Sequence, residues 1–257
     1  MTAKLDNAIA LYMEGIRDGN ARQAVEKYTG DRYTQHSTGV RDGVEGFVAF
    51  FEPFIERNPD RDIRVIRGFE DGSHVFLHAY QNINDGEAEW VTTDFFDTDA
   101  DDRIVEHWDI IAPYTGATPS GHTATDGPTG ITDLERTDQN KAVVAEMIKE
   151  VLILEGNSDR VDEFIAADDR QRYADVADGL DSLRQLVTDP ANPVRYSQIV
   201  LLVGQGNFVA TLCRASREGS PIAQCDLFRL EDGRIVEHWG NAEAIGPESE
   251  WVNSGKF

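Results

Sequence analysis

The chain has 257 residues, including 47 Asp or Glu and 24 Lys or Arg, so its formal net charge is −23. Nucleic acid and anionic membranes are excluded as expected partners because both would be repelled by this charge. Hydrophobic residues make up 40% of the chain, which is enough for one large folded domain or two small ones.

The basic residues are mostly arginine, and there are only five lysines. High Asp and Glu content with Arg in place of Lys resembles proteins of salt-loving organisms, in which dense salt screens self-repulsion. The alternative is an ordinary acidic protein. The N-terminus lacks the apolar stretch of a signal peptide, and no run approaches the length of a membrane span. We therefore expect a cytoplasmic protein.

In chain order, the first half predicts helices and then strands. Apolar residues at helical spacing predict helices over residues 5–17, 21–28 and 44–55, and residues 32–36 look irregular. Strand-like runs separated by Asp-Gly turns follow at residues 62–69, 73–83, 87–97 and 103–111. Helices followed by an antiparallel meander predict an α+β domain.

The second half repeats this order. The six residues Arg103–Trp108 recur unchanged at Arg234–Trp239, which indicates a tandem duplication. Helices are expected at 140–155, 159–167 and 180–187, and strands at 195–203, 207–215, 221–230 and 234–242. We predict domains at residues 1–114 and 136–257, joined by a flexible Gly-, Thr- and Pro-rich linker at residues 115–135.

Strand alternation places candidate functional residues on shared faces. Trp90, Asp94 and Phe96 share one face of the third strand, and His107 and Asp109 share one face of the fourth. His78 of the second strand is a further candidate for this polar face. Both faces of the sheet carry large apolar side chains, so we expect one face to meet helices and the other to meet the sheet of the second half.

An Asp beside a His among aromatic residues suits proton abstraction next to a carbonyl group. The apolar surroundings disfavour the charged carboxylate, which raises its pKa towards the range of a general base, and the imidazole can donate or accept a proton. The alternative is that Asp94 and His107 form a hydrogen-bonded pair with a purely structural role.

Metal binding is the other chemistry considered for these residues, because His36, His78, His107 and Asp94 could converge. No closely spaced ligand pair such as HxxxH or CxxC is present, and no phosphate-binding loop or nucleophile elbow occurs. We expect neither a metal nor a cofactor.

The first half resembles the SnoaL-like polyketide cyclase group of the nuclear transport factor 2-like superfamily over about residues 5 to 114. The resemblance rests on five segments: Tyr33–His36, Asp42–Phe47, Asp71-Gly72, Asp94–Phe96 and Arg103–Asp109. It implies a cone-shaped domain with helices against a curved sheet and a pocket at the open end, and it implies pairing of domains through their sheets.

Site roles follow from the same resemblance. Asp94 would be the catalytic base, with His107 and His36 as donors in the pocket. The remaining pocket-lining residues would be Tyr33, Gln35, Phe51, His78, Trp90, Phe96 and Asp109.

The second half resembles the same group with losses. Asp226 and His238 are kept, but His36 is replaced by Arg172 and Asp109 by Gly240. Either the second pocket binds a different ligand, such as an anion held by Arg172, or this half is mainly a structural partner.

The function predicted from these residues is a cofactor-free cyclase or isomerase acting on a small, partly apolar carbonyl compound. One alternative is a protein that binds a small hydrophobic ligand without turnover, and another is a scaffold with vestigial pockets. The expected partner is a small molecule, the two halves are expected to form an intramolecular pseudo-dimer, and further homo-oligomerisation is left open.

Overall fold

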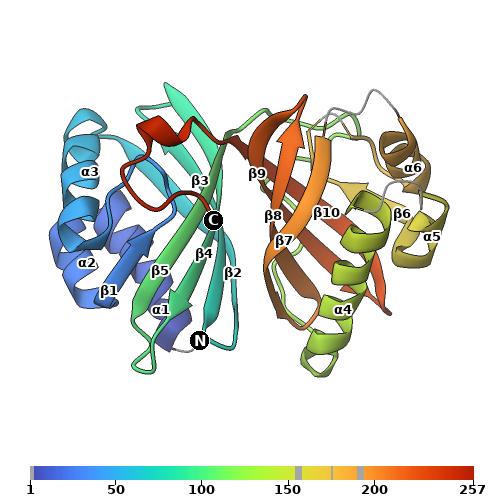
Figure 1. Ribbon diagram of the computed structural model, residues 1–257, viewed down its shortest axis with the longest axis horizontal. Coiled ribbons are helices and arrows are strands. Elements are labelled where there is room, and N and C mark those ends of the chain that lie inside the picture. The colour runs from blue at the N-terminus through green and yellow to red at the C-terminus, as the bar shows by residue number, and fades with distance from the viewer. Residues whose placement is uncertain (1–2, 154–157, 175, 190–193) are drawn as a thin grey trace. The chain divides into compact units, whose positions relative to one another are not determined.

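The computed structural model describes residues 3–153, 158–174, 176–189 and 194–257. It divides into two compact units, shown in Figure 1. The first unit consists of residues 1–113 together with residues 246–257, and the second of residues 114–245. The sequence placed residues 246–257 in the second predicted domain, 136–257, whereas in the structure they belong to the first unit.

The first unit is an α+β domain, as predicted, and its sheet is mixed and has five strands. The sheet order is β1-β5-β4-β3-β2, with β1 parallel to β5 and the remaining neighbours antiparallel. Its elements are α1 (Ala3–Ala10), the π-helix η1 (Leu11–Arg17), α2 (Ala21–Tyr28), β1 (Thr29–Gln35), α3 (Gly43–Arg57), β2 (Arg61–Asp71), β3 (His74–Ile83), β4 (Ala88–Thr98) and β5 (Ile104–Pro113).

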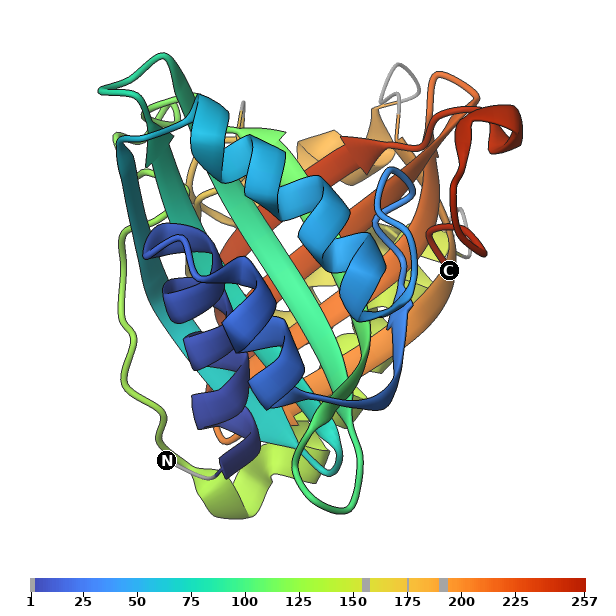
Figure 2. The same ribbon diagram turned by 90° about the vertical axis from the view of Figure 1, so that its left-hand side faces the viewer.

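The helices cover one face of this sheet, as Figure 2 shows for the blue helices. Their apolar stripes meet inward-facing residues such as Val75, Leu77 and Phe96, and this cluster is the core of the unit. On the opposite face, Phe76 packs against Phe69 and Phe95 at ring-centroid distances of 4.9 and 5.1 Å. The predicted pairing of the two sheets stays a prediction.

Two sequence expectations for the first unit are corrected. The stretch read as irregular is mostly strand β1, which pairs with β5 about 70 residues later and has little apolar alternation of its own. Strand β5 has a bulge at Val105, since Thr98 pairs with Ile104 while Asp97 pairs with Glu106. The bulge turns Ile104 to the helix-covered face, together with His107 and Asp109, whereas strict alternation put Ile104 on the other face.

The second unit repeats the fold, with sheet order β6-β10-β9-β8-β7 and a matching irregularity at Val236 of β10. Residues 165–167, predicted as helix, begin strand β6, and the predicted end of the helix at 140–155 lies partly outside the described residues. The elements are η2 (Leu134–Arg136), α4 (Thr137–Met147), η3 (Ile148–Ile153), η4 (Ser158–Arg160), α5 (Val161–Phe164), β6 (Ile165–Gln171), α6 (Leu180–Thr188), β7 (Val194–Gln205), β8 (Phe208–Arg217), β9 (Ser220–Glu231) and β10 (Arg234–Ala244).

The segment predicted as a flexible linker makes specific contacts inside the second unit. His122 Nε2 lies 2.9 Å from Asp178 Oδ2, Trp239 Nε1 donates to the Asp126 carbonyl at 3.1 Å, and Thr132 N donates to Asn207 Oδ1 at 2.9 Å. Its Gly, Thr and Pro composition gave no indication of these contacts.

Cys213 and Cys225 are free, buried thiols on the neighbouring strands β8 and β9. Within the residues that the structure describes, no helix is both long enough and apolar enough to span a membrane.

Gly46, in the first turn of α3, lies very close to the backbone of Arg41. A Cβ on Gly46 would lie 2.0 Å from the Arg41 carbonyl oxygen, whereas a Cβ on Gly39 would meet nothing within 4 Å. We expect Gly46→Ala to destabilise the protein by about 1–3 kcal/mol and Gly39→Ala to change little, as measured by denaturant unfolding. Equal unfolding midpoints for the two variants would contradict the close approach at Gly46.

Candidate active site

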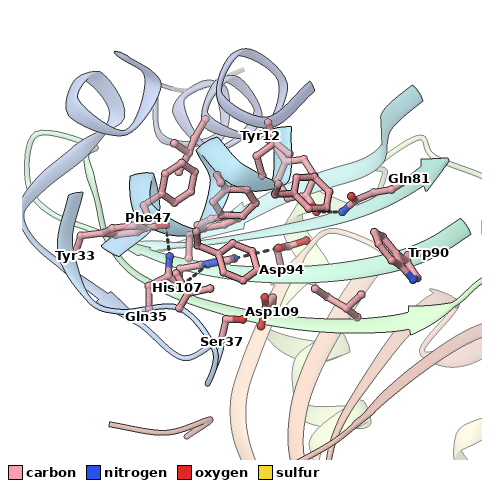
Figure 3. A pocket seen from close by; sticks show the side chains of 18 residues that line it. Tyr12, Tyr33, Gln35, Ser37, Phe47, Gln81, Trp90, Asp94, His107 and Asp109 are labelled. Atoms are coloured by element: carbon pink, nitrogen blue, oxygen red, sulfur yellow. Dashed lines mark hydrogen bonds and ion pairs between the residues drawn. The ribbon is translucent and has the colours of Figure 1, made fainter. Parts of the chain in front are cut away.

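The first unit contains a cavity of about 190 Å³ between its helices and the covered face of its sheet. The walls are largely apolar and aromatic, and Figure 3 shows the side chains that line the cavity. Helices supply Leu11, Tyr12 and Ile16 from η1 and Phe47, Phe50, Phe51 and Phe54 from α3, while the sheet supplies Gln81, Trp90, Asp94, Phe96, His107, Asp109 and Ile111.

A chain of four polar side chains crosses the floor of this cavity. His107 Nε2 lies 3.0 Å from Asp94 Oδ1, and His107 Nδ1 lies 3.0 Å from Gln35 Oε1. Gln35 Nε2 in turn donates to the Tyr33 hydroxyl at 2.8 Å. The register explains the assembly, because Phe96 and Asp94 of β4 lie opposite His107 and Asp109 of β5, while Gln35 of β1 pairs with His107 from the other side.

The hydrogen bonds fix where protons lie in this chain. Gln35 Oε1 is an acceptor, so His107 Nδ1 carries a proton and donates it. One further proton then lies between His107 Nε2 and Asp94 Oδ1. The Tyr33 oxygen accepts from Gln35, which leaves its own hydroxyl proton available for donation into the cavity.

His107 anchors Asp94 through one carboxylate oxygen, Oδ1. Its side chain is 2% exposed, and among the described residues Asp94 Oδ2 has no hydrogen-bond partner although it is buried. Burial raises the pKa of the Asp94 carboxyl, and the charge of Asp109 adds to that rise. The hydrogen bond and charge of His107 oppose it, as does the side chain of Thr92. A buried carboxylate with one free oxygen and a raised pKa has the properties of a general base.

Asp109 is a second carboxylate of the cavity, directly across the strand pair from Asp94. Its Oδ1 accepts a hydrogen bond of 2.9 Å from Lys256 Nζ, and Lys256 is only 2% exposed. Burial raises the pKa of Asp109, but the charges of Lys256 and His107, together with hydrogen bonds from Lys256 and Ser37, outweigh this effect, so the net pKa lies below its ordinary value. The two carboxyl groups are therefore driven in opposite directions, which separates their roles.

A second hydrogen-bonded group lies on the helix side of the cavity. The Tyr12 hydroxyl lies 2.7 Å from Thr92 Oγ1 and accepts from Gln81 Nε2 at 2.7 Å. Burial, with the charge of Asp94, raises the pKa of Tyr12 well above its usual value, so this phenol stays neutral. Tyr12 comes from the π-helix η1, a local distortion often found at functional sites.

Eight of the predicted site residues line the cavity together. They are Tyr33, Gln35, Phe51, Trp90, Asp94, Phe96, His107 and Asp109.

His36 and His78 do not line the cavity, so their predicted places in the pocket are wrong. His36 stacks on Trp108 at 4.6 Å and bonds to Glu106 Oε1 at 2.8 Å, on the opposite face of β5 from His107. His78 pairs with Thr93, one position away from Asp94, so it also faces away from the cavity. Burial and the charge of Arg67, 3.2 Å away, lower the pKa of His78 to about 3.

Sequence reasoning missed Tyr12, Gln81 and Lys256. Tyr12 lies on the apolar stripe of the first predicted helix, a pattern that is typical of core residues, and it packs in the core as well as lining the cavity. Gln81 shares a face with Leu77 and Ala79 on β3. Lys256 gave no local signal, because its partner Asp109 lies 147 residues earlier in the chain.

The second unit contains the matching Asp–His pair, Asp226 and His238, beside a much smaller cavity. His238 Nε2 lies 3.0 Å from Asp226 Oδ1, and Gln224 Nε2 donates to the same oxygen at 2.9 Å. Tyr196 donates to Asp226 Oδ2 at 3.0 Å, so both carboxylate oxygens are occupied. The adjoining cavity measures about 30 Å³.

Arg172 does not line this smaller cavity. It forms ion pairs with Asp126 and Glu237, and its guanidinium lies 4.8 Å from the Trp239 ring. Asp126 and Glu237 already neutralise the Arg172 charge, which was predicted to hold an anionic ligand.

The SnoaL-like domain family matches the chain at residues 9–107 and again at residues 144–238. The chain belongs to this family and contains two copies of its domain.

Solved structures are similar to about half of the chain each. They include a candidate ketosteroid isomerase from Kribbella flavida DSM 17836, at 15% identity over 44% of this chain and 84% of that one, with a TM-score of 0.37. A candidate polyketide cyclase from Bacillus cereus ATCC 10987 has 14% identity over 42% and 73%, with a TM-score of 0.38. A nuclear transport factor 2-like protein of unknown function from Mesorhizobium loti has 21% identity over 46% and 98%, with a TM-score of 0.37. No curated protein sequence matches the chain.

The ionisation of Asp94 gives a stability prediction. The folded state holds the Asp94 proton to higher pH than the unfolded chain does, so this contribution to stability is complete below the ordinary pKa of Asp and is lost as pH rises through the raised pKa. Asp94→Asn cannot ionise, so the variant should melt at a higher temperature than wild type at neutral pH, with a difference that shrinks in acid. Thermal unfolding followed by circular dichroism across pH measures this difference.

Asp226→Asn is the matched control. Both oxygens of Asp226 accept hydrogen bonds, and an amide NH₂ would face one of those donors. The control should therefore melt at a lower temperature than wild type. A lower melting temperature for Asp94→Asn at neutral pH would show that the Asp94 carboxylate is not disfavoured by its surroundings.

Proposed function

We propose that the first unit is a cofactor-free acid/base catalyst of the cyclase or isomerase type, which removes a proton next to a carbonyl group of a small, partly apolar compound. The observation that supports this most directly is the buried Asp94 carboxylate, which His107 anchors through Oδ1 in an aromatic cavity. Its Oδ2 has no hydrogen-bond partner in the part of the chain that the structure describes. Membership of the SnoaL-like family agrees with the proposal but does not define a reaction.

In the proposed reaction, the α-carbon of the substrate faces Asp94 Oδ2. The C–H bond breaks, its proton forms an O–H bond at Oδ2, and the electron pair moves to the carbonyl oxygen as an enolate. The Tyr33 hydroxyl is the suited donor to that oxygen, because its own acceptor position is already taken by Gln35. Protonated Asp94 then returns the proton to another carbon, or to the alkoxide formed when the enolate attacks a second carbonyl.

His107 acts on Asp94 and does not need to touch the substrate. Its Nε2 orients Oδ1, and its Nδ1 is fixed by Gln35, so the carboxylate keeps one orientation. This assigns His107 a positioning role in place of the direct donor role expected from the family resemblance, and Tyr33 takes the donor role that was expected of His36.

The cavity favours an uncharged substrate with an apolar body. Phe47, Phe51 and Phe54 of α3 form one wall, and Phe96 stacks on His107 at 4.6 Å. Asp94 and Asp109 face the same space, so an anionic substrate would be repelled. The same apolar wall also supports the alternative function, binding of a small hydrophobic ligand without turnover.

Exchange of α-protons with deuterium oxide tests the reaction class without knowledge of the natural substrate. We expect wild-type protein to catalyse deuterium incorporation into members of a panel of small aryl and cyclic ketones, as followed by proton NMR. Asp94→Asn should lower the exchange rate by about 10²–10⁴-fold because it removes the base, while retaining ligand affinity in a fluorescence or calorimetric assay.

Asp226→Asn serves as the control for this experiment, since its carboxylate is fully bonded and its cavity is small. It should exchange at the wild-type rate. Ketones that bind with micromolar affinity but exchange no faster in the presence of wild-type protein than in buffer would favour the binding function instead.

We also propose that the protein is adapted to high salt and acts in the cytoplasm. Its net charge of −23 implies self-repulsion in the folded state, which salt screens. The melting temperature should therefore rise steadily as KCl increases from low to molar concentration. A melting temperature that is constant or falls over this range would reject the adaptation.

A further inference from the structure

Residues Gly246–Phe257, called here the C-terminal segment, form part of the first unit although they follow the last strand of the second. Figure 1 shows this segment in red beside β1 and β5. It folds back on itself at Trp251, whose Nε1 donates to the Gly246 carbonyl at 2.9 Å. Gly255 has φ +104°, and a Cβ there would lie 2.3 Å from the Trp251 ring, so the turn requires glycine.

The segment attaches to the loop between β1 and α3, which forms part of the cavity wall. Val252 N donates to the Thr38 carbonyl at 3.0 Å. Asn253 Nδ2 donates to the carbonyls of Ser37 and Val40 at 2.6 and 2.8 Å. Ser37 and Val40 themselves line the cavity. The segment therefore supports the wall of the site from outside.

A further contact involves His36. The Gly255 carbonyl can only accept, so His36 Nδ1 donates to it, at 2.7 Å. The ring is stacked on Trp108. His36 thus attaches the C-terminal segment to the first unit. This contact gives a role to a histidine that was predicted to be catalytic but lies outside the cavity.

The last contact reaches the cavity itself. Lys256 Nζ donates to Asp109 Oδ1 at 2.9 Å, and Asp109 lies across the strand pair from Asp94. Two neighbouring buried carboxylates disfavour simultaneous ionisation, so that one of them retains a proton. A lysine charge on Asp109 removes this competition.

We propose that the C-terminal segment completes the site of the first unit, and that Lys256 is a positioning residue that keeps Asp109 ionised and leaves Asp94 as the single proton acceptor of the cavity. The second clause rests on the role of Asp94 in the proposed function. The groups that face Asp94 are Tyr12 of η1, His107 and Asp109 of β5, and Tyr33 of β1, and among the described residues near the pair Lys256 supplies the cation bonded to a cavity carboxylate.

Carboxyl titration tests the proposal without any need for turnover. The ¹³C carboxyl signals of Asp94 and Asp109 would be followed across pH in full-length wild type, Lys256→Met, Lys256→Gln and Lys256→Arg. Loss of the cation in the first two variants should move the Asp109 transition to higher pH, because burial is then opposed by fewer charges. It should also move the Asp94 transition to higher pH, because Lys256 no longer balances the charge of Asp109 beside it. Lys256→Arg should restore the wild-type transition. Lys27→Met, which removes an exposed lysine of the same unit, is the matched control and should not move it.

The rate measurement separates this role from a structural one. If Asp94 is the base, the acid limb of the pH–rate profile for deuterium exchange should shift to higher pH in Lys256→Met. At pH values on that limb the exchange rate should fall by about tenfold or more relative to wild type. At high pH the two rates should be close. If no ketone exchanges in wild type, the proposed function fails, but the titration still tests Lys256.

Two outcomes would overturn the proposal. One is an Asp94 transition that stays in place in Lys256→Gln while the methyl NMR spectrum shows an intact fold. The other is a cavity wall unaffected by removal of residues 255–257, shown by unchanged amide signals of Ser37 to Val40. Should Lys256→Met fail to fold, Lys256→Gln decides, because it keeps a donor to Asp109 and removes only the charge.

Discussion

The hydrogen bond between His107 and Asp94 is the interaction on which the first unit's site depends. It holds the Asp94 carboxylate in one orientation inside an aromatic cavity, whose walls stabilise a charge less well than water does. The fold provides the means, because β4 and β5 place the two residues on neighbouring positions and β1 supplies Gln35 to fix the imidazole. A charge kept in such surroundings is unfavourable for folding, so the surrounding structure must stabilise the arrangement.

The two units show how the same pair can serve different ends. In the second unit, Asp226 has lost its open oxygen to Tyr196, and Gln224 adds a further bond. By strand register, Tyr196 stands where the first unit has Ile63, and Gln224 stands where it has Thr92. Two substitutions on the covered face of the sheet thus accompany the change from an open carboxylate to a saturated one. This contrast supports a structural role for the second pair.

Much of the fold followed from the sequence, because the repeated Arg-Ile-Val-Glu-His-Trp segment and the alternating strands are local patterns. Alternation placed Asp94, Trp90 and Phe96 together, since β4 pairs with β3 without irregularity. It did not decide the side of His78, because a register offset of one residue exchanges the faces. The bulge at Val105 was likewise invisible, although His107 and Asp109 both follow it and so stayed on one face. Strand β1 and Lys256 were missed for a common reason: their partners are distant in sequence, and no local periodicity reports them.

The position of Lys256 has a consequence for how the protein is made. Asp109 and Lys256 are separated by 147 residues, which include the whole second unit. When β5 has emerged from the ribosome, both carboxylates of the cavity, Asp94 and Asp109, have therefore been synthesised. Lys256, whose ammonium group bonds to Asp109, has not. During translation the nascent domain has to tolerate this imbalance, and it reaches its final charge state only after its duplicate has been synthesised.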